Sequence, residues 1–144
     1  VKLKGAGYAL VIFTSQGAVA RGNATLGQME AVNDRLRTLL SEASGDANLI
    51  AGTYACPYHP TGTVAFFTKE STWRKPQPGM ILTAAQELGL DLEASWAIGD
   101  KPRDVEAGVN AGLKPGRCLL LATSGERGPF ADLPMAAAHV LAMT

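Results

Sequence analysis

Residues 9–17 read ALVIFTSQG, an unbroken apolar run that ends in polar and small residues. A run without polar alternation is typical of a strand buried on both faces, as in the middle of a parallel sheet. The hydroxyl residues and Gln16 that follow mark the start of a polar loop at the end of this strand. The segment predicts a central strand at residues 9–13 and, with it, an α/β fold.

The rest of the chain alternates short apolar runs with longer helical patterns. The apolar runs predict further strands at residues 49–55, 96–98 and 118–122. Apolar residues at helical spacing predict helices at residues 26–44, 79–88 and 105–111. Such alternation is typical of a three-layer, Rossmann-like parallel sheet with helices on both faces.

Three segments complete this outline. Thr25 and Gln28 have the spacing of a capping box, which begins the helix at residues 26–44. Residues 56–78 form a loop longer than most connections, and long loops in compact domains often carry function. Residues 134–141 have a weaker pattern that fits a helix or a strand.

Length and composition limit the classes of protein that the chain can represent. At 144 residues it suits one domain, residues 1–144, and its 47% hydrophobic and 18% charged content is ordinary for a globular protein. Thirteen basic residues balance thirteen acidic ones, so no overall charge attracts nucleic acid or an anionic membrane. No apolar run approaches the ~20 residues of a membrane span. The start shows no apolar signal-peptide core, so we expect a cytoplasmic protein.

Polar residues follow two of the predicted strands, at the ends where ligands bind in open parallel sheets. Thr14, Ser15 and Gln16 follow the first strand. Asp100 follows the strand at residues 96–98, and Asp104 comes four residues later. Each signal alone has an ordinary structural explanation, because threonine often caps strands, Gly-Asp often forms turns, and an aspartate suits the first turn of a helix.

Two basic residues, Arg74 and Lys75, stand shortly before the helix at residues 79–88, whose N-terminus itself favours an anion. Taken alone, such a pair is usually a solvated surface. Cations neutralise phosphate charge, a hydroxyl such as that of Thr14 donates to phosphate, and a carboxylate such as Asp100 binds Mg²⁺. The joint pattern therefore indicates a site for a phosphate and its metal ion.

In this order and spacing the residues resemble three of the four motifs of haloacid-dehalogenase (HAD) hydrolases. The motifs correspond to Thr14, to Lys75 and to the pair Asp100 and Asp104. A finer resemblance is to the subfamily of D-glycero-D-manno-heptose-1,7-bisphosphate phosphatases and histidinol phosphatases. It runs from about residue 3 to residue 124 and is carried by TSQGAVARG at 14–22, CPYHP at 56–60, RKPQPGM at 74–80 and GDK at 99–101.

The resemblance implies a HAD-like fold and Mg²⁺-dependent hydrolysis of a sugar phosphate such as heptose 1,7-bisphosphate. In that family an aspartate attacks phosphorus, and a second aspartate two residues later acts as general acid and base. Of the implied catalytic residues, Thr14 and Lys75 would hold the phosphate and Asp100 would bind Mg²⁺, with Asp104 supporting the metal site from behind. The implied substrate contacts are Ser15, Gln16, Arg21, Arg74 and Lys101.

The chain departs from the family pattern at the nucleophile. No Asp-x-Asp occurs in the sequence, and thirteen residues precede Thr14, whereas the family's nucleophile strand lies some tens of residues earlier. We therefore expect the first strand to be missing, an N-terminally truncated domain, and weak binding of Mg²⁺. The alternative function is a noncatalytic phosphate-binding or assembly module derived from such a phosphatase.

Two further departures concern the long loop and the substrate contacts. Relatives often hold a structural zinc in this loop, but Tyr58, Ser71 and Trp73 stand at its ligand positions, so we expect no zinc. Cys56 is then expected to be a small buried or loop residue. Ser15 stands where the subfamily has asparagine, so its contact to substrate would differ.

The missing strand also bears on assembly. The resemblance places it between the strands that end at Thr14 and at Asp100, so its absence would leave two apolar strand edges. We expect these edges to pair directly, to swap a strand, or to be covered in a homo-oligomer. A small phosphorylated substrate is the other expected partner.

Overall fold

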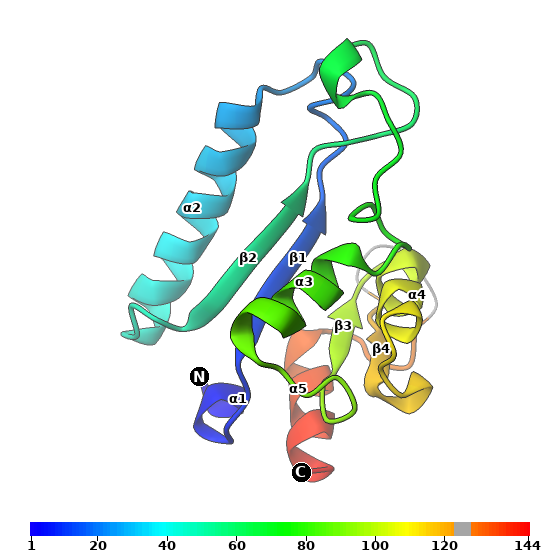
Figure 1. The fold of residues 1–144 in the computed structure, drawn as a ribbon. Helices are drawn as coiled ribbons and strands as arrows, with labels where there is room; N and C mark the ends of the chain where they lie inside the picture. Colours follow the sequence, from blue (N-terminus) through cyan, green and yellow to red (C-terminus); the bar gives the residue numbers. More distant parts are fainter. Residues whose placement is uncertain (123–127) are drawn as a thin grey trace.

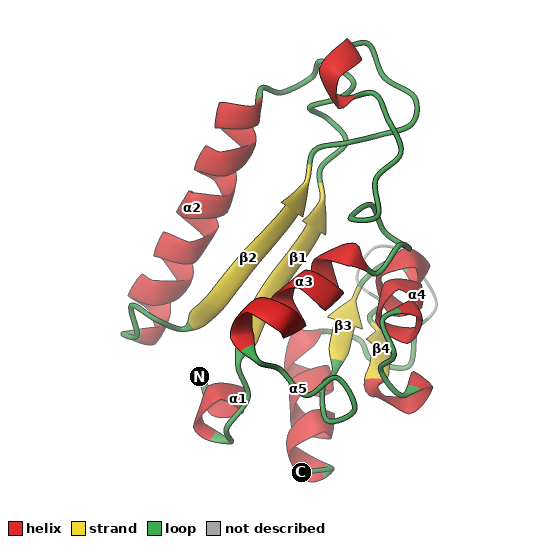
Figure 2. Ribbon diagram, viewed as in Figure 1, coloured by secondary structure: helices red, strands yellow, loops and turns green. Residues whose placement is uncertain are grey.

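The computed structural model describes residues 1–122 and 128–144. Strands and helices alternate along the chain, and the strands are parallel within each sheet (Figures 1 and 2). The elements are α1 (Lys2–Gly5), β1 (Leu10–Ser15), α2 (Leu26–Ser44), β2 (Ile50–Cys56), α3 (Gly79–Leu88), β3 (Ala97–Gly99), α4 (Pro102–Asn110), β4 (Cys118–Leu120) and α5 (Leu133–Ala142). Two short 3-10 turns, η1 (Ala65–Phe67) and η2 (Pro115–Arg117), lie in the connections. The α/β fold with parallel strands is confirmed.

The strands form two separate sheets. β1 pairs with β2, with Phe13 opposite Tyr54, and β3 pairs with β4, with Ile98 opposite Leu119. Within the described residues no ladder joins β1 to β3, so direct pairing, one of the three expected arrangements of these edges, is not the one that the structure shows. The resemblance would place a further strand in the interval between them. Homo-oligomerisation through these edges stays a prediction.

β1 is less buried than its sequence predicts. All six of its residues are half-buried, because β2 is the one strand that pairs with it among the described residues. Val11 and Phe13 pack against a cluster that α3 completes from one face. The buried members of that cluster are Tyr54, Cys56, Met80 and Ala84.

The sheet of β3 and β4 is covered by a helix on each face, as predicted. Cys118 faces α4, where Gly108 leaves room for its sulfur. Leu119, the next residue, faces α5 and packs against Ala136 and Val140. Successive strand residues point to opposite faces, so the short apolar run of β4 fills two cores at once.

Helix boundaries follow the capping chemistry of the sequence. Thr25 Oγ1 accepts a hydrogen bond from Gln28 N at 3.1 Å and Gln28 Oε1 accepts one from Thr25 N at 2.9 Å, which confirms the capping box. α4 begins earlier than predicted because Pro102 occupies its first turn, where a fixed φ and a missing N–H are tolerated. Residues 134–141 lie in helix α5, which Asp132 caps.

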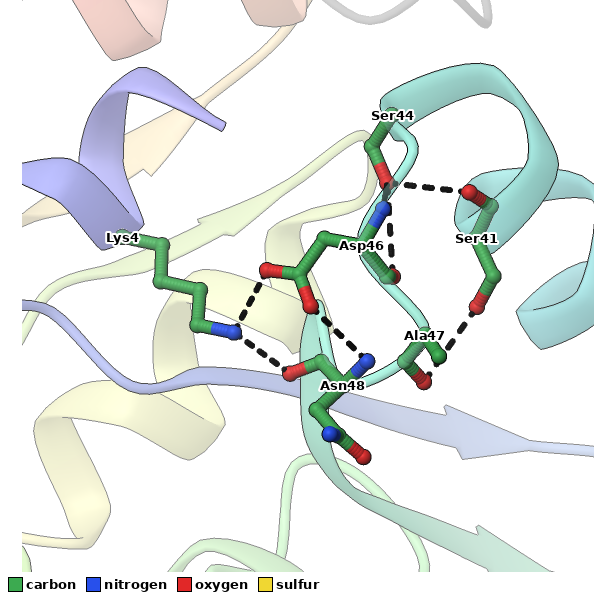
Figure 3. A network of polar contacts seen from close by, with 6 residues as sticks. All are labelled: Lys4, Ser41, Ser44, Asp46, Ala47 and Asn48. Atoms are coloured by element: carbon green, nitrogen blue, oxygen red, sulfur yellow. Dashed lines mark hydrogen bonds and ion pairs between the residues drawn. The ribbon is translucent and has the colours of Figure 1, made fainter.

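Lys4 anchors the turn between α2 and β2 (Figure 3). Its Nζ donates to Asp46 Oδ2 at 2.6 Å and to the carbonyl oxygen of Asn48 at 2.9 Å. The hydrogen bond from Lys4, aided by one from the Asn48 N–H, lowers the pKa of the Asp46 carboxyl below its usual value. These contacts fix the start of β2 beside α1, a four-residue helix too short to show a periodic pattern.

A hydrogen bond joins α3 to β2 beside the cluster of Tyr54, Cys56, Met80 and Ala84. Tyr54 Oη donates to Glu87 Oε2 at 2.6 Å. This hydrogen bond, together with burial and the negative charge of Glu87, raises the pKa of Tyr54 to about 12. The phenol therefore stays neutral and holds α3 in place.

None of the helices in the described ranges is both long enough and apolar enough to cross a membrane. The cytoplasmic location stays a prediction.

Candidate active site

The end of β1 is tied directly to the loop that precedes α3. β1 ends at Ser15, two residues later than predicted, because β2 also pairs with Thr14 and Ser15. Ser15 Oγ accepts a hydrogen bond from the backbone N–H of Lys75 at 3.2 Å. Ser15, which is half-buried at the strand end, therefore helps to fix the backbone position of Lys75.

Lys75 is a buried cation with one carboxylate partner. Its Nζ lies 2.5 Å from Asp104 Oδ1, and the two side chains are only 10% and 7% exposed. The same ammonium lies 5.0 Å from the centre of the Phe13 ring, above its face. Lys75 thus joins β1 to α4 across the interval between the two sheets.

Asp104 approaches β3 because Gly99 has no side chain. A Cβ built on Gly99 would overlap the Cβ and carboxylate of Asp104. Asp104 Oδ2 accepts a hydrogen bond from the backbone N–H of Lys101 at 3.0 Å, so both carboxylate oxygens are engaged. The carboxylate therefore serves to hold Lys75 and the start of α4.

Asp100 and Thr14 lie at the same side of the two sheets. Asp100 follows β3, Thr14 lies near the end of β1, and the arrowheads of these strands point toward the same side in Figure 1. Both residues are half-buried. Mg²⁺ commonly binds one or two carboxylates and takes its other oxygens from substrate phosphate and water. The carboxylate of Asp100 fits an ion shared with a phosphate in this way.

Gln16 is directed elsewhere. Its Oε1 accepts a hydrogen bond from Nδ2 of Asn33 at 3.0 Å, and Asn33 is a buried residue of α2. The amide oxygen of this implied substrate contact is thus engaged with α2. Asn33 was not recognised from the sequence, where it stands as one polar position in an amphipathic helix.

Arg74 points to a different partner from its neighbour Lys75. Its Nη2 lies 3.3 Å from Nε2 of His59, in the long loop. Arg21 also approaches this point, with Nη1 3.0 Å from where a Cβ of Gly17 would lie. His59 was not singled out in the sequence, although its place in the CPYHP segment at residues 56–60 was a signal that could have found it.

Cys56 is fully buried in the core beneath α3, as expected of a small buried residue. Within the described residues, no group of three or more His, Cys, Asp or Glu side chains could hold a metal ion. The expected lack of structural zinc stays a prediction.

Comparison with known proteins identifies the relatives of this chain. A HAD-hydrolase-like family model matches residues 72–141. The D-glycero-β-D-manno-heptose-1,7-bisphosphate 7-phosphatase of Escherichia coli K12 is 37% identical over 131 residues, which cover 91% of this chain and 66% of that protein. The corresponding enzyme of Yersinia pestis is 39% identical over 112 residues, which cover 78% of this chain and 58% of that protein. The chain thus spans less than two thirds of the length of these relatives.

Solved structures give the same assignment. A candidate HAD-like phosphatase from Mesorhizobium loti superposes with a TM-score of 0.78 at 30% identity, covering 97% of this chain and 68% of that one. The D,D-heptose 1,7-bisphosphate phosphatase of B. bronchiseptica, solved with magnesium and phosphate, gives a TM-score of 0.77 at 24% identity, covering 99% and 79%, and supports the fold. From the motifs, the fold and these relatives, the chain belongs to the HAD-like hydrolases.

Proposed function

We propose that this chain supplies the phosphate-binding and magnesium-binding half of a phosphatase site for a sugar phosphate such as heptose 1,7-bisphosphate. The observation that carries the proposal is the buried Lys75 ammonium, held by Asp104 between the ends of β1 and β3. A buried ion pair adds little net stability by itself, so its place at the ligand-binding edge of parallel strands favours a role in binding an anion there. The relatives named above act on heptose bisphosphate, which supports this substrate class.

Each residue has a distinct role in this proposal. Lys75 places a positive charge beside the phosphate oxygens, and the Thr14 hydroxyl donates a hydrogen bond to them. Asp100 would hold Mg²⁺ through one carboxylate oxygen. When bound, the ion would neutralise charge on the phosphoryl group as it is transferred. Asp104 keeps Lys75 in place and does not need to meet the substrate.

Hydrolysis in this family requires an aspartate nucleophile, and the 144 residues contain no Asp-x-Asp pair. We infer that a strand that carries the nucleophile would fit between β1 and β3, which form no ladder with each other within the described residues. The edges of β1 and β3 that carry no ladder in the described part of the chain favour the second candidate function, a noncatalytic module that binds phosphate and assembles through them.

An assay of heptose 1,7-bisphosphate and an aryl phosphate with Mg²⁺ distinguishes the two functions. The chain is tested alone, with a synthetic strand peptide that carries Asp-x-Asp-Gly, and with a matched Asn-x-Asp-Gly peptide. We expect turnover only with the first peptide, because the second lacks the nucleophile. We also expect Asp100→Asn and removal of Mg²⁺ to abolish that turnover.

Phosphate binding without turnover under any of these conditions would instead support the noncatalytic module. Turnover that survives both the asparagine peptide and Asp100→Asn would contradict the proposed mechanism. If neither turnover nor phosphate binding occurs, both functions are wrong and only the fold relates this chain to the phosphatases.

A further inference from the structure

A second group of basic side chains lies apart from Lys75, around the turn that follows β1. Gly17 stands at its centre, because a Cβ there would lie 3.0 Å from Nη1 of Arg21 and 3.1 Å from Cδ2 of His59. Arg74 completes the group through its contact with His59. Within the part of the chain that the structure describes, neither arginine forms an ion pair with a carboxylate.

The backbone of His59 is held firmly within a long loop. Its N–H donates to the carbonyl oxygen of Phe67 at 3.1 Å, and its carbonyl accepts from Lys69 N at 3.0 Å. Its ring Nδ1 lies 2.7 Å from the carbonyl oxygen of Thr61. The backbone of His59 and its ring Nδ1 are therefore both held, which directs Nε2 away from Thr61.

The contacts of the ring favour one tautomer. A guanidinium can only donate, so Nε2 of His59 must present its lone pair to Arg74 Nη2 at 3.3 Å. The ring proton then lies on Nδ1, where the Thr61 carbonyl accepts it. The backbone N–H of Thr61 is also directed at Nδ1, at 3.0 Å, and the Nδ1–H form gives up that hydrogen bond. The Nε2–H form would instead place a ring N–H against the charged guanidinium, donor against donor. The shorter contact of Nδ1, to the Thr61 carbonyl oxygen, and the positive charge of Arg74 both favour the Nδ1–H form.

A neutral acceptor orients an arginine without cancelling its charge. A carboxylate in the place of His59 would fix the guanidinium equally well, but it would also neutralise the charge that attracts an anion. Arg74 keeps its full charge and its remaining N–H donors. Arg74 contacts His59 and Lys75 pairs with Asp104, so the side chains of these two adjacent cations point in different directions.

We propose that His59 is a positioning residue that aims Arg74 at a second anionic group of the substrate, distinct from the phosphate at Lys75. The substrate class is then a small molecule with two anionic groups, such as a sugar bisphosphate. The inference deepens the proposed function and rests on it for the first of the two anion positions. The contact between His59 and Arg74 itself does not depend on catalysis.

Nitrogen-15 NMR of the intact chain tests the contact. The chain has two histidines, and the spectrum of His59→Gln identifies the signals of His59 by their loss. We expect the pattern of a ring protonated on Nδ1 with an unprotonated Nε2 at neutral pH. A ring protonated on Nε2 would overturn the proposal, because Arg74 would then face a donor.

Binding of glucose 1,6-bisphosphate and glucose 6-phosphate tests the recognition role. We expect His59→Leu to weaken binding of the bisphosphate about 10-fold more than binding of the monophosphate. A factor of this size corresponds to the loss of about one hydrogen bond to a charged group. His59→Gln is the matched control, because its side-chain oxygen can still accept a hydrogen bond from Arg74. Its affinity for the bisphosphate should lie within about 3-fold of that of the natural protein. Equal weakening of both ligands would mean a merely structural role and would overturn the proposal.

The two proposals fail in different ways. If the natural protein binds neither sugar phosphate, the proposed function and the recognition role of His59 are both wrong, whatever the tautomer. If the monophosphate binds through Lys75 and Thr14 but His59→Leu leaves the preference for the bisphosphate unchanged, only the role of His59 is wrong.

Discussion

Lys75→Met is expected to destabilise the folded protein by about 3 kcal/mol, because it leaves the Asp104 carboxylate buried without its cation. Asp104 is 7% exposed and lies 2.5 Å from the ammonium, so water cannot readily replace the lost partner. Asp104→Asn alone should also be costly, since it leaves Lys75 buried and unpaired. Urea denaturation followed by tryptophan fluorescence measures both losses.

The double variant Lys75→Met with Asp104→Asn is the control for this prediction. It removes both charges together, and the asparagine can still accept the hydrogen bond from Lys101 N. We expect the double variant to be more stable than the sum of the two single losses by at least about 1 kcal/mol. Additive losses would mean that the two side chains do not depend on each other.

Gly99→Ala should have a comparable effect, about 3 kcal/mol, by a different cause. The added methyl group would overlap the Cβ of Asp104, which α4 holds in place, so backbone at the end of β3 must move. For a domain of this size we expect the midpoint of thermal unfolding to fall by about 10 °C. The shift would also pull Asp104 from Lys75 and weaken phosphate binding.

Gly116→Ala is the matched control for Gly99→Ala. A Cβ on Gly116 meets nothing within 4 Å, and its φ lies outside the left-handed region. We expect its midpoint to stay within about 2 °C of the natural protein. An equally large fall of the midpoint in both variants would show that replacing glycine by alanine is unfavourable in general, and would contradict the specific role of Gly99.

Patterns among neighbouring residues were enough to predict most of the secondary structure. The capping box at Thr25 and the apolar spacing after it placed α2 correctly, because a cap and a helical face are both properties of neighbouring residues. The bounds of α3 also match, since Gly89 ends the helix in the left-handed conformation that glycine favours. Elements with such local signals can be recognised without knowledge of the tertiary structure.

Long-range features were harder to predict. The run at residues 9–13 indicated a fully buried strand, but full burial requires a second neighbouring strand, and the described residues supply only β2. The pairing of Lys75 with Asp104, 29 positions apart in the sequence, depends on how α4 packs beside β3. The contact of His59 with Arg74 likewise arises only when the long loop folds back on itself. No periodicity or motif spacing encodes these contacts.

We propose that Asp100, Thr14 and Lys75 together form a site for phosphate and Mg²⁺. Calorimetric titration of inorganic phosphate into the natural chain, with and without Mg²⁺, tests it most directly, with Asp34→Asn as an exposed control. We predict that phosphate binds with Mg²⁺ present and that Asp100→Asn weakens it about 10-fold or more, while Asp34→Asn leaves it unchanged. Phosphate binding that is equally strong in Asp100→Asn and independent of Mg²⁺ would contradict the claim.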